Sequence, residues 1–318
     1  MTTGARLYAS IQWRRNDGLH ALFLVLAAFA AIYAILFPGI FAVGALAKFV
    51  QGWFPTATVA AAETIVMLAG GIDLSVGPMV SLGSVVAAST MQGPLGIFGG
   101  VLAMLALGAG VGAVVGAFVA IGRYPAIIVT LALSFVLRGV ALLILPRPGG
   151  YVPPSLSEFL AGDQPSAAFL LILLVALWKI YQATPLGIGL IATGDNAEGA
   201  YRSGVNVTAA RTCAYIASGV LQAFTGLYVA AQTGSGDPVI GEPLTLAAIA
   251  AAVLGGVGFL GGQGTMRGAL AGSLLMSILI NVMFFMRLPL VAQYVVQGLI
   301  IVVTVALPLI RASWRRAT

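Results

Sequence analysis

The chain has 318 residues, of which 60% are hydrophobic and only 8% are charged. An ordinary soluble domain carries about 25% charged residues, so this composition excludes that class. The net charge of +6 does not indicate nucleic-acid binding, because the basic residues are scattered at the ends of apolar runs rather than clustered with aromatic residues. A single cysteine, Cys213, excludes an internal disulfide and a thiolate metal cluster.

The apolar runs predict an all-α polytopic membrane protein. A hydrocarbon core about 30 Å thick requires roughly 20 apolar residues per helical span. Runs bounded by glycine, proline and charge predict about ten transmembrane helices in one domain, 1–318, with glycine-rich helix breaks. The expected spans lie near 20–37, 56–70, 77–91, 96–121, 125–145, 167–182, 213–232, 244–258, 267–286 and 290–310.

The distribution of basic residues predicts the orientation in the membrane. An even number of spans returns both termini to one side, and the positive-inside rule assigns that side to the cytoplasm. Lys48, Arg147 and Arg287 then lie outside, and Arg138 lies within a span. The other basic residues lie on or beside the cytoplasmic face: Arg6, Arg14, Arg15, Arg123, Lys179, Arg202, Arg211, Arg267, Arg311, Arg315 and Arg316.

Three connecting segments are long enough to have structure of their own. The segment 38–55 is expected to form an interfacial helix on the outer surface. The segment 146–166 is the longest outer loop, and it is either a surface for an extracytoplasmic partner or a bare connector. The cytoplasmic segment at about 183–212 reads as a soluble helix-turn-helix for docking, because Asp195 or Asn196 can cap a helix and Gly204 can end it.

Two glycine-rich strings interrupt the apolar pattern, GGIDLSVG at 70–77 and LGGVGFLGGQG at 254–264. Irregular backbone at membrane depth is tolerated only where protein or a water-filled cavity satisfies it, and broken helices mark transport pathways. Close-packed turns between helices are the alternative. The residues expected at a pathway or gate are Gly70, Gly71, Asp73, Ser75, Gly77, Gly255, Gly256, Gly261 and Gly262.

Ionisable residues within the expected spans are few. Glu63, Asp73 and Arg138 lie inside or near them, where a charge is costly and must be paired or hydrated. Asp73 is also placed to cap a helix that begins near Ser75, which is a structural role. Arg138 has no evident partner in its own helix, so bonds to Asp73, to Glu63 or to carbonyl groups are the alternatives.

No catalytic constellation is evident, and we expect no cofactor and no metal. The single histidine, His20, has no serine, cysteine or carboxylate arranged around it. The chain also lacks a phosphate loop of the form GxxxxGK[ST], so we expect a separate subunit to hydrolyse any ATP that drives transport.

Four strings in colinear order resemble the permease subunits of ribose-type monosaccharide ABC importers. They are GGIDLSVG at 70–77, YPAIIVTLALSFVLRGVALL at 124–143, ATGDNAEGAYRSGVNV at 192–207 and AIAAAVLGGVGFLGGQGT at 248–265. The resemblance implies a second permease subunit, cytoplasmic ATP-binding subunits and a periplasmic sugar-binding protein. It also implies an ATPase coupling loop that contains Gly194, Asn196, Glu198, Arg202, Ser203 and Gly204.

The sequence departs from the family pattern at several positions. It has AAETIVML at 61–68, which places Glu63 unusually, GEPLTLAA at 241–248 and Pro78 after the first string. These departures allow either a homodimer or a paralogous heterodimer, and they leave the sugar or polyol unidentified. A stand-alone secondary transporter that uses Asp73 and Glu63 is the leading alternative function, and a channel is the third.

Overall fold

The structure is a computed structural model that describes residues 24–35, 37–42, 44–162 and 165–317. Arg6, Arg14, Arg15 and His20 lie outside the described residues, as does the start of the first expected span. Within the described residues the chain is built from helices, and the one pairing of extended backbone is an isolated bridge between Gly149 and Gly236.

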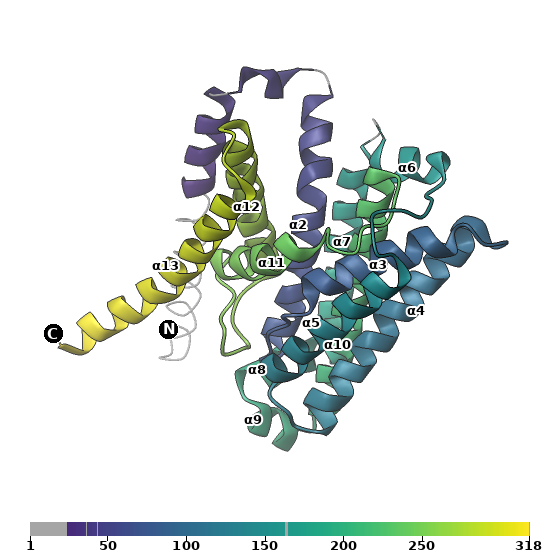
Figure 1. Cartoon of the computed structure of the whole chain (residues 1–318). Coiled ribbons are helices and arrows are strands. Elements are labelled where there is room, and N and C mark those ends of the chain that lie inside the picture. The colour runs from purple at the N-terminus through teal and green to yellow at the C-terminus, as the bar shows by residue number, and fades with distance from the viewer. Residues whose placement is uncertain (1–23, 36, 43, 163–164, 318) are drawn as a thin grey trace.

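The helices follow one another with short connections (Figure 1). A helix at Leu24–Ile35 comes first. The remaining elements are η1 (Pro38–Phe41), α2 (Ala45–Leu68), α3 (Val76–Thr90), α4 (Gly96–Gly116), the π-helical turn η2 (Ala117–Ile121), α5 (Ala126–Ile144), α6 (Pro154–Ala161), α7 (Ser166–Ala183), α8 (Pro185–Asp195), α9 (Ala197–Arg202), α10 (Val207–Thr233), α11 (Glu242–Leu254), α12 (Met266–Phe285) and α13 (Leu290–Ala317).

Five helices are long and apolar enough to cross a membrane by length and composition: α4 continued by η2, α5, α7, α10 and α12. Four shorter apolar helices accompany them, at Leu24–Ile35, Val76–Thr90, Glu242–Leu254 and Val291–Val303. Each expected span therefore coincides with a helix over most of its described length. The count of ten crossings stays a prediction.

The expected interfacial helix at 38–55 is wrong. Only the short η1 lies on its own, and the rest of the segment opens α2, which passes through Pro55 without a break. Proline lacks the N–H that would bond the carbonyl four residues earlier, which belongs to Gln51. That carbonyl instead accepts a hydrogen bond of 3.0 Å from Gln232 Nε2 on α10, which satisfies the acceptor and lets the helix continue.

The helix α10 is packed between α2, α3 and α4. Glycines on α3, α4 and α10 let the backbones touch. A Cβ atom at Gly83 would lie 2.9 Å from the Ala223 carbonyl oxygen, and one at Gly108 would lie 2.7 Å from the Gly219 carbonyl oxygen. Small residues at helix interfaces produce this close approach in membrane proteins.

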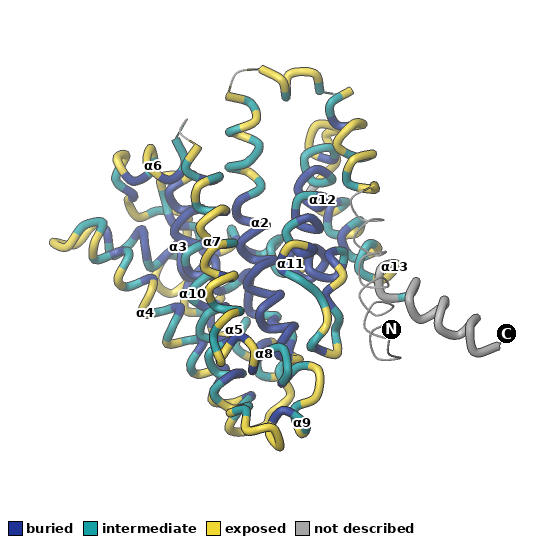
Figure 2. Tube along the Cα trace, turned by 180° about the vertical axis from the view of Figure 1, so that it is seen from behind, coloured by how far each residue is buried: buried dark blue, intermediate teal, exposed yellow. Residues whose placement is uncertain are grey.

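A second group of helices, α11, α12 and α13, lies on the other side of α2. The helix α2 thus joins both groups, and it is buried continuously from Phe54 to Leu68, at the centre of the molecule in Figure 2. Figure 1 places η1 and α6 at one end of the molecule and α8 and α9 at the opposite end. This separation agrees with the assignment of 38–55 and 146–166 to one face of the membrane and of 183–212 to the other.

Candidate translocation and coupling site

The first glycine string separates α2, which ends at Leu68, from α3, which begins at Val76. The Asp73 carboxylate organises the connection. Its Oδ1 accepts hydrogen bonds from the Ser75 amide at 2.8 Å and from the Ser75 hydroxyl at 2.5 Å, while its Oδ2 accepts one from Gln222 Nε2 on α10 at 2.8 Å. Asp73 therefore orders the entrance to α3, the structural role that the sequence allowed, and also ties it to α10.

Glu63 is fully buried on α2 behind this connection. Its Oε1 accepts a hydrogen bond of 3.2 Å from the Asp73 amide, and its Oε2 has no hydrogen-bond partner among the described residues. A buried charge is costly unless it is paired and hydrogen-bonded. Two acidic side chains therefore lie in one buried region, Glu63 on α2 and Asp73 in the connection at 69–75.

Thr130 on α5 holds the other side of the same connection. Its hydroxyl oxygen accepts a hydrogen bond of 3.1 Å from the Leu74 amide, and its single proton lies within reach of two acceptors, the Ala126 carbonyl at 2.9 Å and the Ile72 carbonyl at 3.2 Å. Buried backbone groups that lie outside a helix need such partners. The α2–α3 connection is therefore satisfied by side chains from α2, α5 and α10.

The start of α3 also contacts the start of α11. The Gly77 amide donates a hydrogen bond of 3.0 Å to Thr245 Oγ1. A Cβ atom at Gly77 would lie 2.4 Å from the Gly241 carbonyl oxygen, a distance that real Cβ atoms do not show. Glycine at this position allows two chain segments 164 residues apart to touch, as the close-packing alternative required.

The second glycine string connects α11 to α12 and contains four glycines with left-handed φ values: Gly256 (79°), Gly261 (91°), Gly262 (66°) and Gly264 (118°). Residues other than glycine rarely adopt this conformation. Gly255 packs against α12, where an added Cβ would lie 2.3 Å from the Gly268 carbonyl carbon. Both strings thus make close-packed turns, and their part in a pathway or gate stays a prediction.

Four glycines from three distant segments meet at one place, which we call the glycine junction: Gly70, Gly194, Gly261 and Gly262. A Cβ at Gly194 would lie 1.8 Å from the Leu68 carbonyl oxygen and 2.6 Å from the Gly262 nitrogen. A Cβ at Gly261 would lie 2.7 Å from the Gly194 carbonyl oxygen and 2.8 Å from the Gly70 Cα. Three of the expected gate glycines and one residue of the expected coupling loop are therefore in direct backbone contact.

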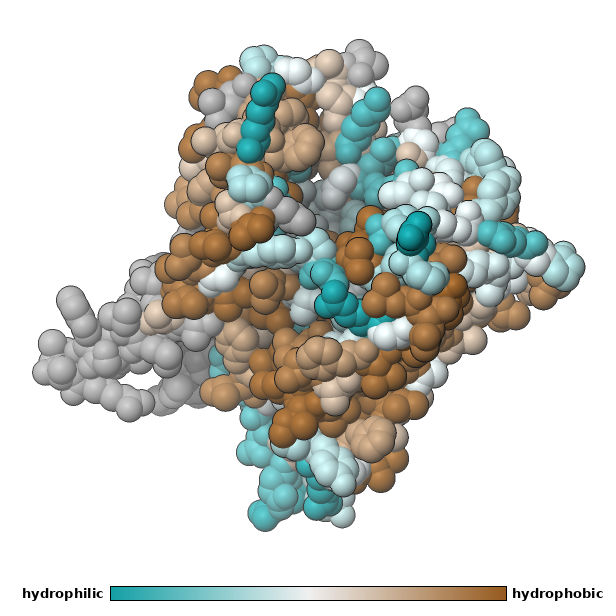
Figure 3. Space-filling view, in the orientation of Figure 1, coloured by the Kyte–Doolittle hydropathy of each residue, from teal (hydrophilic) through white to brown (hydrophobic). Residues whose placement is uncertain are grey.

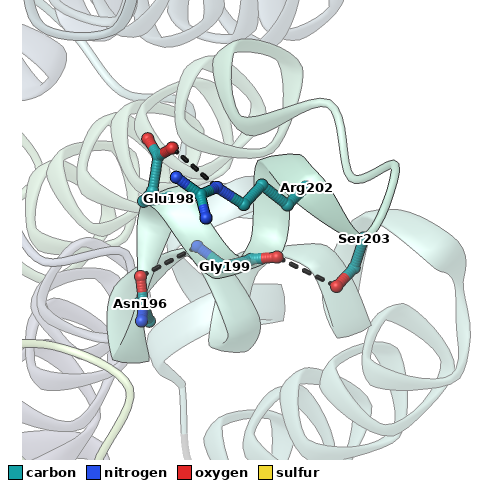
Figure 4. A network of polar contacts seen from close by, with 5 residues as sticks. All are labelled: Asn196, Glu198, Gly199, Arg202 and Ser203. Carbon is teal, nitrogen blue, oxygen red and sulfur yellow. Dashed lines mark hydrogen bonds and ion pairs between the residues drawn. The ribbon is translucent and has the colours of Figure 1, made fainter.

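The helix α8 carries Gly194, and the short helix α9 follows it directly (Figure 4). Asn196 caps α9 by accepting a hydrogen bond of 2.9 Å from the Gly199 amide, so of the two expected caps it is the asparagine that acts. Glu198 and Arg202 form the expected ion pair at 3.0 Å. Ser203 Oγ donates to the Gly199 carbonyl at 2.9 Å, and Gly204 follows with φ of 83°.

The segment expected to be a cytoplasmic helix-turn-helix is shorter than the sequence indicated. Asn206 accepts a hydrogen bond of 2.9 Å from the Ala209 amide and caps α10, which begins at Val207 rather than near 213. A capped helical start offsets the unsatisfied amides of the first turn, and polar residues are tolerated there. The element between α7 and α10 is thus α8, α9 and their connections, and α10 follows directly after the Asn206 cap.

A cavity of about 930 Å³ lies beside these helices. Gly70 and Gly71 line it from the first glycine string, together with Arg123 from the η2–α5 turn and Arg211 and Tyr215 from α10. A Cβ at Gly71 would lie 2.3 Å from the Tyr215 hydroxyl oxygen. The cavity therefore lies between the first glycine string and α9, and both segments line it.

The expected partners of Arg138 are wrong. Its Nη2 lies 2.8 Å from Glu242 Oε1, at the start of α11, rather than near Asp73, Glu63 or a carbonyl group. The face of α5 that packs against α3 carries Thr130, Leu137 and Ala141, which are buried. Arg138 is one position past that face, so its side chain points away from the first glycine string and toward α11.

Sequence reasoning missed Gln222, Thr130 and Glu242. Ser218 and Gln222 are spaced i, i+4 in an otherwise apolar span, and the Gln222 amide donates 2.9 Å to the Ser218 hydroxyl. Polar residues within an apolar span mark interhelical bonds, and this spacing could have identified Gln222. Thr130 and Glu242 lie in strings already singled out, but nothing local indicates which distant group each one contacts.

Comparison with known proteins assigns the chain to a family. The model of the family described as branched-chain amino acid transport system / permease component matches residues 49–305. The ribose import permease protein RbsC of Escherichia coli (strain K12) is 33% identical over 315 residues, 96% of this chain and 97% of that protein. The L-arabinose ABC transporter permease protein AraH of Azospirillum brasilense is 32% identical over 273 residues, 82% of this chain and 78% of that protein. The chain belongs to this family of permease components.

A further relative is the autoinducer 2 import system permease protein LsrC of Yersinia enterocolitica, 33% identical over 246 residues, 75% of this chain and 68% of that protein. No solved structure matches the chain. The protein is thus a multi-pass membrane protein and a permease subunit of an ABC importer, a transport subunit rather than an enzyme.

Proposed function

We propose that this permease subunit carries a monosaccharide or a similar small polyol from the periplasm to the cytoplasm. Support comes from relatives named for ribose and L-arabinose import, which align with 96% and 82% of the chain. The family description names branched-chain amino acids, so the sugar assignment rests on these individual relatives and on the strings that resemble monosaccharide permeases.

The observation that carries a transport mechanism is the glycine junction. It joins the end of α8 to both glycine strings by direct backbone contact between Gly194, Gly70 and Gly261. A displacement of α8 and α9 therefore acts on both connections, α2–α3 and α11–α12, without an intervening side chain. This arrangement fits a coupling element that receives the movement of an ATP-binding subunit, which we assign to α9 and its ends at Asn196 and Gly204.

The assembly that we propose contains two cytoplasmic ATP-binding subunits, a periplasmic sugar-binding protein and a second permease subunit, either identical or paralogous. In the inner membrane the chain crosses about ten times with both termini in the cytoplasm. The positions of α8 and α9 opposite η1 and α6 support this orientation (Figure 1). The glycines of the two strings then lie at the solute path.

Uptake of radiolabelled pentoses and hexoses into proteoliposomes tests the proposal. Vesicles that contain the permease with its ATP-binding subunits and the sugar-binding protein should take up one such sugar only when ATP is supplied. The purified chain alone should not hydrolyse ATP, because it lacks a phosphate-cradling loop. ATP-dependent uptake of an amino acid instead of any sugar would contradict the substrate class.

The same vesicles test the secondary-transport alternative, which Glu63 and Asp73 favour because buried carboxylates bind coupling ions in such transporters. Vesicles with the permease alone and an imposed proton or sodium gradient should show no uptake. Gradient-driven uptake without the ATP-binding subunits would replace the ABC mechanism with the alternative.

A further inference from the structure

The ion pair between Arg138 and Glu242 lies on an exposed face of the described chain. The side chains are 52% and 37% exposed although Arg138 belongs to α5, an apolar helix long enough to cross a membrane. Arg138 is the thirteenth of nineteen residues in α5, so it lies about 9 Å before the end of the helix. A charged pair at this depth is costly in hydrocarbon, so we expect the pair to face water or protein rather than lipid.

The pair ends a polar stripe along α5. Thr130, Ser134 and Arg138 are spaced four residues apart, so they wind by about 80° around α5, from Thr130 on the buried face to Arg138 on the exposed face. Thr130 bonds to the first glycine string, so the stripe runs from that string toward the start of α11 over about 12 Å. Figure 3 shows hydrophilic side chains interrupting the apolar surface between the regions of α11 and α3.

The opposite side of α5 has a different character. Val136 lines an apolar groove between α4 and α5 together with Val114, Phe118 and Leu133. Val136 is two residues after Ser134, hence about 200° around the helix. The apolar groove suits lipid or another apolar helix, whereas the stripe does not. Ser134 and Val136 are therefore expected to face two different surroundings, the polar stripe and the apolar groove.

We propose that Ser134 and Arg138 of this stripe, completed by Glu242, form a wall of the solute path and contact the hydroxyl groups of the solute, while the buried Thr130 anchors the stripe to the first glycine string. This inference rests on the proposed import of a sugar or polyol and identifies the residues that would select it. The pair carries no net charge, yet it presents guanidinium donors and carboxylate acceptors side by side. Adjacent hydroxyl groups on a neutral solute match this arrangement.

The pair also disfavours other solutes of the same size. A free amino acid carries an ammonium and a carboxylate group, and binding it between Arg138 and Glu242 would require breaking an existing ion pair at 2.8 Å. A polyol adds hydrogen bonds to both partners without separating them. Selection at this wall therefore follows the number and spacing of hydroxyl groups.

Thiol accessibility tests the position of the wall without reference to transport. In a Cys213→Ala background, Ser134→Cys and Val136→Cys are each treated, in spheroplasts, with a membrane-impermeant methanethiosulfonate reagent. Because thiolate reactions require water, Ser134→Cys should react at least about tenfold faster than Val136→Cys. Equal rates, or a faster reaction at Val136→Cys, would overturn the inference. This result does not depend on which solute is imported.

Selectivity tests the contact with hydroxyl groups. The readout is the ratio of uptake rates for the sugar that the parent transporter carries and for its deoxy analogue, at equal permease abundance. Glu242→Gln and Arg138→Gln should lower this ratio several-fold, and Glu158→Gln, at an exposed position on α6, should leave it unchanged. Unchanged ratios in both pair variants would overturn the proposed contact. Failure of the parent to take up any sugar would instead refute the proposed function.

Discussion

The Gly262 amide donates a hydrogen bond of 3.1 Å to the Leu68 carbonyl oxygen, joining the second glycine string to the last residue of α2. Leu68 and Gly262 are 194 positions apart, yet Gly194 of α8 lies directly against both of these groups. An unpaired carbonyl at a helix end is costly when buried. The bond therefore satisfies the end of α2 and fixes the place where three segments meet.

Gly194→Ala should destabilise the protein, because the added Cβ would lie 1.8 Å from the Leu68 carbonyl oxygen. Overpacking of this kind costs about 1–3 kcal/mol. Gly110→Ala is the matched control, since Gly110 is also helical and its added Cβ meets nothing within 4 Å. Thermal unfolding in detergent, read for both variants, should show a lower midpoint for Gly194→Ala alone. Equal midpoints would contradict the close packing of the junction.

Reversal of the charges at Glu198 or Arg202 should leave membrane insertion intact while lowering uptake and retention of the ATP-binding subunit. Both side chains are largely exposed, and an i, i+4 pair contributes only about 0.2–0.5 kcal/mol to a helix. Co-purification of the ATP-binding subunit and uptake at equal permease levels are the measurements.

The double variant, Glu198→Arg with Arg202→Glu, separates a local role from a docking role. It restores an ion pair within α9 but presents the opposite charge pattern to a partner. We expect it to remain defective. Full recovery of uptake would show that only the local pair matters and would rule out docking through these charges.

Gly204→Val should lower uptake through a change in the backbone rather than through a clash. Gly204 has φ of 83°, and an added Cβ would meet nothing within 4 Å. The left-handed conformation costs most residues roughly 1–2 kcal/mol, while asparagine tolerates it. Gly204→Asn should therefore retain more uptake than Gly204→Val when the two are compared at equal abundance. The reverse order would contradict a role for this turn.

Gln222→Leu should destabilise the protein by about 1–3 kcal/mol, because it removes the amide that bonds Asp73 Oδ2 at 2.8 Å and leaves a buried acceptor without a partner. Gln182→Leu is the control, since the Gln182 side chain has no hydrogen bond among those found in the described residues. Unfolding midpoints of the two variants give the comparison. A larger loss in Gln182→Leu would show that the Asp73–Gln222 bond has little weight.

A reporter fused after Thr318 should be active only in the cytoplasm, because the predicted topology places most basic residues on the side that carries α8 and α9. A periplasmic reporter at Pro153, at the start of α6, should be active in the opposite compartment. Alkaline phosphatase and green fluorescent protein fusions at both positions provide the measurement. Periplasmic activity at Thr318 would refute the topology.

The sequence predicted helix positions well where apolar runs are long, as in α4, α5, α7 and α12, because burial in lipid imposes the run directly. Local polar patterns also succeeded: Asn196 caps α9, and Glu198 pairs with Arg202. Local rules failed at Pro55, where a distant glutamine supplies the missing bond to Gln51 and keeps α2 continuous.

The contacts that join segments could not be read from the sequence. Arg138 and Glu242 are 104 positions apart, and their pairing depends on how α5 and α11 pack. The two glycine strings could be recognised in the sequence. Their contact with Gly194, through Gly70 and Gly261, depends on how the helices pack. Each string alone is compatible with many kinds of turn. Its sequence does not show which distant segment packs against its glycines.

The backbone contacts of α10 limit how this bundle can move. At Gly83, Gly108 and Gly226 an added Cβ would lie 2.3–2.9 Å from a carbonyl oxygen of a neighbouring helix. Sliding α10 by one residue would bring larger side chains to these glycine contacts. The resulting overpacking would destabilise the bundle. The helices α3, α4 and α10 are therefore expected to move together as one block, because sliding one helix past another would force side chains against these carbonyl oxygens.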